Sequence, residues 1–63
     1  MLISNTSILT GITRSVELPV TKAELERWSN GELIQYVFPH LSDDDREFLM
    51  TGITPEEWDS IHQ

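Results

Sequence analysis

The first regular pattern in the chain is an alternation of apolar and polar residues between Ile12 and Leu18. Successive side chains of a strand point to opposite sides, so this alternation predicts a half-buried β-strand over 12–18, ended by Pro19. One face of the strand holds a charge among apolar residues, and its members are Ile12, Arg14, Val16 and Leu18. Arg14 can be accommodated near a strand end, because its aliphatic stem can lie over the core.

A single strand cannot satisfy its own backbone hydrogen bonds, so the strand over 12–18 needs a partner. That partner is either residues 2–9 of the same chain or the same strand in a second copy of the chain. Residues 1–10 mix apolar residues with a polar run at 4–7, and they form either a frayed terminus or a first strand. A hairpin and a homodimer paired through 12–18 are both compatible with this pattern.

After Pro19 the apolar residues are spaced three and four apart, which predicts four short helices over about 22–29, 32–38, 42–51 and from 54 onward. Three of these starts have a hydroxyl residue followed three positions later by a carboxylate: Thr21 with Glu24, Ser42 with Asp45, and Thr54 with Glu57. In such a capping box the hydroxyl accepts a hydrogen bond from the first turn, and the carboxylate accepts one from the N–H of the cap residue. We therefore expect these three carboxylates to be held at helix starts.

Each predicted helix has one apolar side that should face the core. The expected core residues are Leu25 and Trp28 in the first helix, Leu33, Ile34, Val37, Phe38 and Leu41 in and after the second, Phe48 and Leu49 in the third, and Trp58 and Ile61 in the fourth. Gly31, Pro39 and Gly52 stand where the first three helices should end. Glycine adopts the left-handed conformation of a helix end, and proline restricts the residue before it away from helical geometry.

The 63 residues predict one small domain, 1–63, of the α+β class and mostly α: one N-terminal strand or hairpin followed by four short capped helices. A chain of this length buries only about 60% of the surface that its unfolded form exposes, so its stability is marginal. There is no cysteine, which excludes disulfides, thiolate chemistry and the common structural zinc sites. Self-association is therefore the first candidate for additional stabilisation.

The formal charge of −7 is concentrated toward the C-terminus, where residues 42–63 carry one arginine against seven acidic residues, a net of −6. An acidic field repels phosphate backbones, so nucleic acid is a disfavoured partner. Such a field suits either simple solubility or binding to a basic surface of another protein. The first ten residues hold no basic residue and no long apolar run, so no targeting segment or membrane span is expected and the cytoplasm is the expected compartment.

The residues able to carry chemistry do not form a recognisable catalytic or metal site. Asp43, Asp44 and Asp45 are consecutive, and such side chains on a helix point about 100° apart, so they cannot converge on one ion as EF-hand ligands do. They instead complement the positive N-terminal end of a helix. His40 lies at a turn and His62 near the C-terminus, both as surface residues, and no glycine-rich phosphate loop is present. We predict a non-catalytic protein without metal or cofactor.

With Glu24, Asp45 and Glu57 assigned to helix starts, the other acidic residues after position 42 are available to a partner. Tyr36 is added because it projects off the apolar stripe of the second helix, and tyrosine is enriched at interfaces. The predicted partner-binding residues are Tyr36, Asp43, Asp44, Glu47, Glu56 and Asp59. The predicted function is binding to another protein through this acidic and aromatic helical surface.

An alternative is a dimeric DNA-binding transcriptional regulator of the ribbon-helix-helix type, in which strands pair between subunits and two helices follow. The strand over 12–18 and the helices after it have that element order. The face that would read bases offers Thr13, Ser15 and Glu17. Glu17 and the net charge argue against this alternative, because phosphate contacts supply most of the affinity for DNA.

One set of segments carries a resemblance to known proteins: Leu18-Pro19-Val20-Thr21, Trp28, Gly31-Glu32-Leu33-Ile34-Gln35, Phe38-Pro39-His40-Leu41-Ser42, Arg46-Glu47-Phe48-Leu49 and Thr51-Gly52-Ile53-Thr54-Pro55-Glu56-Glu57-Trp58. Through these segments about two thirds of the chain, from Leu18 to Trp58, resembles short bacteriophage and prophage proteins of no established activity. The resemblance implies a viral or mobile-element origin and an accessory factor that acts on a host or viral protein in the host cytoplasm. It assigns no role to any residue.

Overall fold

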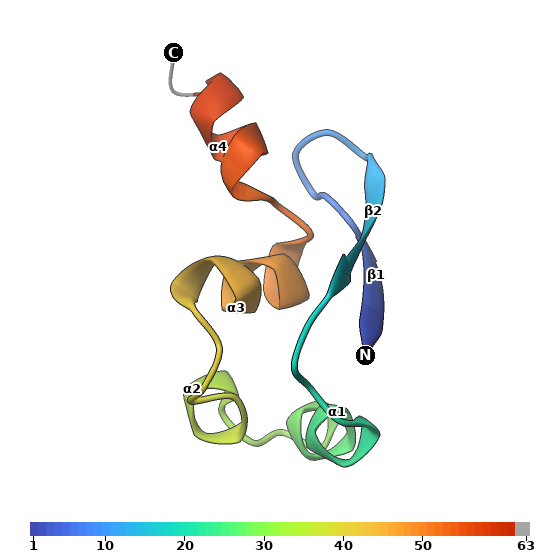
Figure 1. Cartoon of the computed structure of the whole chain (residues 1–63), viewed down its shortest axis with the longest axis vertical. Coiled ribbons are helices and arrows are strands. Elements are labelled where there is room, and N and C mark those ends of the chain that lie inside the picture. The colour runs from blue at the N-terminus through green and yellow to red at the C-terminus, as the bar shows by residue number, and fades with distance from the viewer. Residues whose placement is uncertain (62–63) are drawn as a thin grey trace.

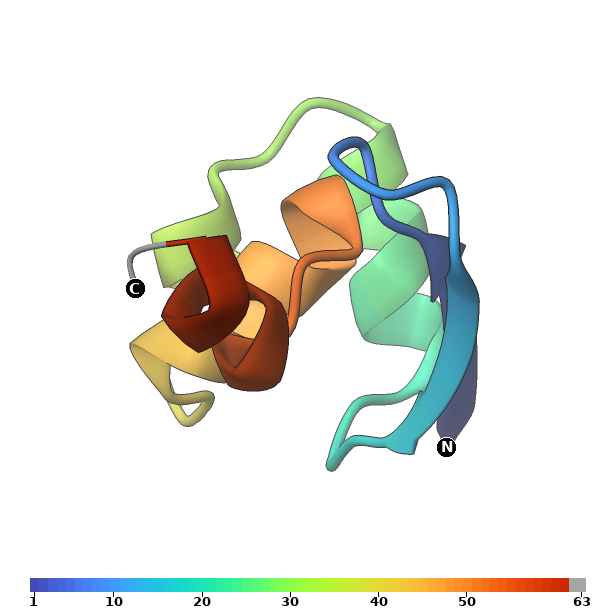
Figure 2. The same ribbon diagram turned by 90° about the horizontal axis from the view of Figure 1, so that it is seen from above.

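The computed structural model describes residues 1–61 as an N-terminal β-hairpin followed by four helices, which confirms the α+β prediction (Figure 1). The elements are β1 (Leu2–Thr6), β2 (Thr13–Glu17), α1 (Lys22–Ser29), α2 (Ile34–Val37), α3 (Asp43–Thr51) and α4 (Pro55–Ile61). α3 lies beside the hairpin (Figures 1 and 2). α1 and α2 lie toward one end of the molecule, and α4 lies at the other (Figure 1). His62 falls outside the described residues.

The hairpin supplies the partner strand that β2 needs from within the chain. β1 and β2 are antiparallel, so residues 2–6 form a first strand rather than a frayed terminus. Ile3 lies opposite Val16 and Asn5 lies opposite Arg14, and these four residues form the partly buried face. A homodimer through β2 is therefore not needed for backbone pairing and stays a prediction.

The other face of the hairpin is polar and exposed. The hydroxyl oxygens of Ser4 and Ser15 lie 2.6 Å apart, and those of Thr6 and Thr13 lie 2.8 Å apart, so cross-strand hydrogen bonds link this face. The prediction that Ile12 belongs to the buried face is wrong. β2 begins at Thr13, and Ile12 lies in the connecting loop with 49% of its surface exposed.

The three predicted capping boxes form to different extents. At α1 the box is complete, since the Glu24 N–H donates to Thr21 and the Glu24 carboxylate accepts from the Thr21 N–H at 2.8 Å. At α3 the Ser42 hydroxyl accepts from the Asp45 N–H at 3.2 Å. The prediction that Glu57 is held at the start of α4 is wrong, because its carboxylate binds the hairpin instead.

α2 is shorter than the predicted helix over 32–38 and begins at Ile34. Leu33 precedes it with an extended backbone (φ −66°, ψ 138°), so its side chain leaves the apolar stripe and is 55% exposed, contrary to the prediction. Val37, Phe38 and Leu41 are buried as predicted.

α4 turns a different side toward the protein from the one predicted. Trp58 and Ile61 are 37% and 50% exposed, whereas Glu57 is buried. Consecutive helical residues are rotated by about 100°, so burial of Glu57 against the hairpin turns Trp58 toward the surface. The prediction of an apolar inner face on α4 is therefore wrong.

The core lies where the end of the hairpin meets α1, α2 and α3. Its buried members are Leu18, Val20, Val37, Phe38, Leu41, Phe48 and Leu49. Trp28 packs edge-on against Phe38, with ring centroids 6.0 Å apart and an interplanar angle of 84°. Leu25 and Trp28 pack against this cluster as predicted, so α1 is fixed by apolar contact rather than by backbone pairing.

An exposed ion pair spans the turn between α1 and α2. Arg27 donates to Glu32 through Nε and Nη2, the latter at 2.8 Å. These hydrogen bonds lower the pKa of Glu32 and raise that of Arg27 from their ordinary values. The contribution of the pair is thus present above the ordinary pKa of a glutamate and is lost as the pH falls through the lowered value. Because both side chains are solvent-exposed, that contribution is small.

The hairpin closes the C-terminal end of α3. Gly52 ends the helix in the left-handed conformation, with φ 75°. The Asn5 side-chain amide donates to the Phe48 carbonyl at 3.0 Å. The Ile8 N–H donates to the Thr51 carbonyl at 3.0 Å. The Asn5 amide also donates to the Leu49 carbonyl at 3.2 Å. The hairpin thus provides donors to the Leu49 and Thr51 carbonyls in the last turn of α3, where carbonyls lack partners within the helix.

Gly52 lies directly against the backbone of the hairpin. A Cβ atom at this position would lie 2.5 Å from the carbonyl carbon and oxygen of Thr6 and 2.7 Å from the nitrogen of Ser7. Backbone atoms cannot move aside as the end of a flexible side chain can. Glycine is therefore required here by the contact as well as by the positive φ.

We predict that Gly52→Ala lowers the free energy of unfolding by more than about 2 kcal/mol, because it adds a backbone clash to the strain of the left-handed conformation. Gly11→Ala is the matched control: its φ is 72°, but no atom lies within 4 Å of the added Cβ. We expect the control to lose about 1 kcal/mol. Urea unfolding followed by tryptophan fluorescence measures both, and equal losses would show that φ alone makes Gly52 necessary.

Candidate functional site

A cavity of about 300 Å³ lies between β2 and the first turns of α3 and α4. Its lining residues are Val16, Ser42, Asp44, Asp45, Phe48, Thr54, Pro55 and Glu56. This volume is at the small end of the range for ligand pockets. The cavity therefore suits one small group rather than a large ligand.

The two helix starts meet at the cavity because the chain reverses between them. Ser42 is the N-cap of α3, and Thr54 takes the same position before α4, where its hydroxyl accepts from the Glu57 N–H at 3.4 Å. Gly52 turns the chain just before Thr54. Each cap is followed by acidic residues in the first helical turn, so the reversal gathers carboxylates from both helices at one place.

The inner wall and the outer rim of the cavity differ in chemistry. Phe48 and Thr54 are 3% and 8% exposed, so they form the inner wall, together with the partly buried Val16. The carboxylates are more exposed and lie toward solvent. We call these three residues the acidic rim: Asp44, Asp45 and Glu56. The cavity is thus apolar inside and negatively charged at its edge.

The acidic rim has no balancing cation among residues 1–61. The nearest arginine in sequence, Arg46, pairs with Asp43 at 3.1 Å instead. The two helix N-termini supply roughly half a positive charge each, about +1 together, against three carboxylates. The local balance is therefore close to −2, and the cavity favours a cation.

The structure brings only part of the predicted partner-binding set to this cavity. Asp44 and Glu56 line it. Asp43 is exposed but paired with Arg46, and the partly buried Glu47 accepts from the Thr51 hydroxyl at 3.5 Å. Asp43 and Glu47 therefore both have intramolecular contacts, whereas the sequence indicated that they were available to a partner.

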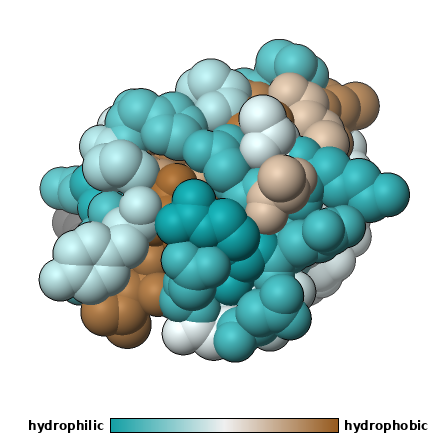
Figure 3. Space-filling model, turned by 90° about the horizontal axis from the view of Figure 1, so that it is seen from below, coloured by the Kyte–Doolittle hydropathy of each residue, from teal (hydrophilic) through white to brown (hydrophobic). Residues whose placement is uncertain are grey.

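The remaining two predicted residues lie elsewhere. Asp59 is exposed on α4 outside the cavity lining, and Tyr36 is 70% exposed on α2. The face on the side of α1 and α2 is largely hydrophilic, with apolar atoms in separate areas rather than one continuous patch (Figure 3). Tyr36 belongs to α2, which contributes no residue to the cavity lining.

Sequence reasoning missed Asp45 as a member of the site. Its main-chain N–H bonds to the Ser42 hydroxyl as expected, but its side chain lines the cavity. The capping pattern fixes the backbone of this residue and leaves the direction of its carboxylate undetermined. The contribution of Phe48 to both the core and the cavity was also invisible in the sequence.

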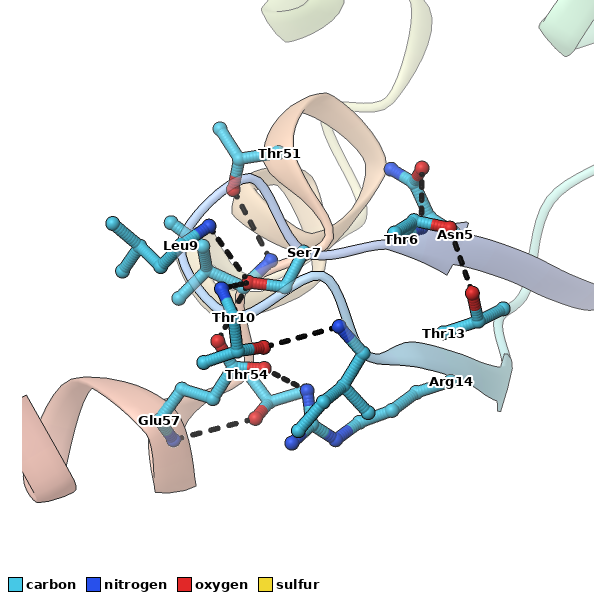
Figure 4. A network of polar contacts seen from close by, with 12 residues as sticks. Asn5, Thr6, Ser7, Leu9, Thr10, Thr13, Arg14, Thr51, Thr54 and Glu57 are labelled. Atoms are coloured by element: carbon cyan, nitrogen blue, oxygen red, sulfur yellow. Dashed lines mark hydrogen bonds and ion pairs between the residues drawn. The ribbon is translucent and has the colours of Figure 1, made fainter.

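A second polar group, the Ser7–Arg14–Glu57 network, joins the hairpin to α4 (Figure 4). The Ser7 hydroxyl donates to Glu57 Oε1 at 2.6 Å, and the Arg14 guanidinium forms an ion pair with Glu57 Oε2. Glu57 is 6% exposed, Ser7 is 2% exposed, and the Arg14 side chain is 32% exposed. A buried carboxylate needs such compensation, so the network fixes how α4 sits against the hairpin.

The network also explains the charge on the apolar face of β2. The guanidinium of Arg14 pairs with Glu57, a partner that the sequence did not indicate. The one sign of this ion pair in the sequence is the presence of an arginine on the otherwise apolar face of residues 12–18. Because Ser7 also accepts from the Leu9 N–H at 3.2 Å, the network orders the hairpin loop. The Arg14 guanidinium also neutralises the buried Glu57 carboxylate.

Two further searches of the described part of the chain bear on function. Among residues 1–61, no group of three or more histidine, aspartate or glutamate side chains is placed to hold a metal ion. Over the same residues, no helix is long and apolar enough to cross a membrane.

Comparisons of the chain with protein-family models, with curated proteins and with solved structures returned no match. The functional argument therefore depends on the residues and geometry described above.

We predict that Glu57→Gln lowers the free energy of unfolding by about 2 kcal/mol, because it leaves the Arg14 charge partly buried without its partner. Arg14→Met keeps the stem and removes the charge. The double variant should lose less free energy of unfolding than the sum of the two single losses, by about 1 kcal/mol, because both substitutions remove the same interaction. Urea unfolding measures all three variants.

Glu56→Gln is the matched control for this cycle, because Glu56 is the exposed neighbour of Glu57 on the same helix. We expect it to change stability by less than about 0.5 kcal/mol. Strictly additive losses for Arg14 and Glu57 would contradict the structural role of the network.

Proposed function

We propose that this chain is a small non-catalytic accessory protein that binds a basic segment of another protein through the cavity and the carboxylates around it. The observation that carries the proposal is the acidic rim, where three carboxylates from two helices surround an apolar cavity without an intramolecular ion pair among the described residues. Unpaired charge beside an apolar wall is a feature of a surface that is completed by a partner.

The overall charge supports the same class of partner. The chain carries −7, and Glu47 and Asp59 add negative charge on the same two helices as the acidic rim. Such a field accelerates the approach of a basic surface and repels nucleic acid. An acidic protein of this kind can also occupy a nucleic-acid-binding groove of its partner, because it presents a similar charge.

The proposed origin is a bacteriophage or prophage, and the proposed place of action is the host cytoplasm. This part of the proposal follows from the resemblance of residues 18–58 to short phage proteins. The proposed partner is a host or viral protein.

The ribbon-helix-helix alternative has less support. Its base-reading face would be Thr13, Ser15 and Glu17, which are exposed on the hairpin. However, Thr13 and Ser15 already bond to hydroxyls of β1, and β2 pairs within the chain rather than with a second subunit. The protein-binding proposal is therefore preferred.

We predict that a fluorescent hexalysine peptide binds the protein at low salt, and that anisotropy titration will show weaker binding as salt is raised. The triple variant Asp44→Asn, Asp45→Asn, Glu56→Gln should weaken this binding by about tenfold or more, because it neutralises the acidic rim. Circular dichroism and urea unfolding will verify that the variant is folded.

The matched control is the triple variant Glu17→Gln, Glu26→Gln, Glu32→Gln. It removes the same number of charges, three, from residues outside the cavity lining. We expect it to weaken binding by less than about threefold, through the long-range field alone. Absence of hexalysine binding at low salt, or binding of duplex DNA in a gel-shift assay, would contradict the proposed function.

A further inference from the structure

We infer that the cavity receives a single lysine side chain of the basic partner, with its aliphatic stem inside and its ammonium group at the acidic rim. This inference rests on the proposed function and specifies what the site recognises. The volume of about 300 Å³ is too small for a folded element and large enough for one long side chain.

The lining matches the two chemical parts of a lysine side chain. Val16, Phe48 and Pro55 provide apolar surface, which suits the four methylene groups of the stem. The acidic rim makes the edge of the cavity negative, which attracts the ammonium group to that edge. A purely apolar side chain would leave the carboxylates unpaired, and a short cation would not use the apolar wall.

The arrangement of the carboxylates favours lysine over arginine. Asp44 and Asp45 are consecutive on α3, so their side chains diverge by about 100° around the helix, and Glu56 comes from α4. An ammonium group is a compact charge without a preferred plane, so it can bind one carboxylate of the acidic rim at a time. A guanidinium group is planar and matches one carboxylate in a bidentate pair, which this divergence does not offer.

The helix dipoles do not reverse this preference. The N-termini of α3 and α4 both lie at the cavity, and their positive ends oppose a cation. Their combined effect is roughly one positive charge, which is smaller than the charge of three carboxylates. The net attraction for an ammonium group remains.

Peptides of equal charge and different stem length will test the inference. Hexalysine is compared at pH 6 with a hexapeptide of 2,4-diaminobutyrate, whose side chains are two methylene groups shorter, and with hexaarginine. We expect hexalysine to bind about tenfold more tightly than the short-stemmed peptide, because two fewer methylene groups are buried. Hexaarginine should bind more weakly than hexalysine.

Two-dimensional NMR of the ¹⁵N-labelled protein locates the bound peptide. Hexalysine should change the backbone amide chemical shifts of Val16, Phe48 and Thr54, which are lining residues of the cavity. These changes should exceed those of Glu26 and Glu32, which are not lining residues. Equal affinity for all three peptides, or shifts confined to exposed acidic residues outside the cavity, would overturn the lysine site and leave the proposed function standing. No binding of any of the peptides would overturn both.

Discussion

The contact between the C-terminal end of α3 and the hairpin determines where the last third of the chain lies. Gly52 is the point of closest approach, because only a residue without a side chain fits against the Thr6–Ser7 backbone there. The same residue reverses the chain through its left-handed conformation. The point at which the chain leaves α3 is therefore fixed by a steric constraint.

The polar network of Ser7, Arg14 and Glu57 completes this constraint. Gly52 sets the position at which α4 begins, and the buried carboxylate of Glu57 sets which side of α4 faces the hairpin. With that side fixed, Glu56 falls at the cavity beside the first turn of α3. Glu56 and Glu57 are thus neighbours in sequence that face different surroundings: Glu57 is bound within the protein, and Glu56 lies at the cavity where we propose that a partner binds.

The local signals in the sequence predict much of the fold. The hydroxyl–carboxylate pairs mark the starts of α1, α3 and α4, and α1 has the predicted bounds. These signals involve residues that are close in the sequence, so they can be recognised without a structure. The hydrogen-bond partners of Glu57 could not be predicted in this way. A carboxylate three residues after an N-cap gives the same sequence pattern whether it bonds to the cap residue or to a distant arginine. The exposure of Trp58 follows from that unseen pairing.

The candidate site required the relative placement of two helices and a strand, which no local pattern provides. Asp44 and Glu56 could be named as free acids, but nothing in the sequence placed them together or joined Asp45 to them. The most direct test of the central claim is the measurement of intermolecular NOEs between the protein and ¹³C-labelled hexalysine. The account predicts NOEs from lysine methylene protons to the Val16 methyl groups and the Phe48 ring. Binding without these NOEs, and with contacts restricted to residues outside the cavity, would contradict it.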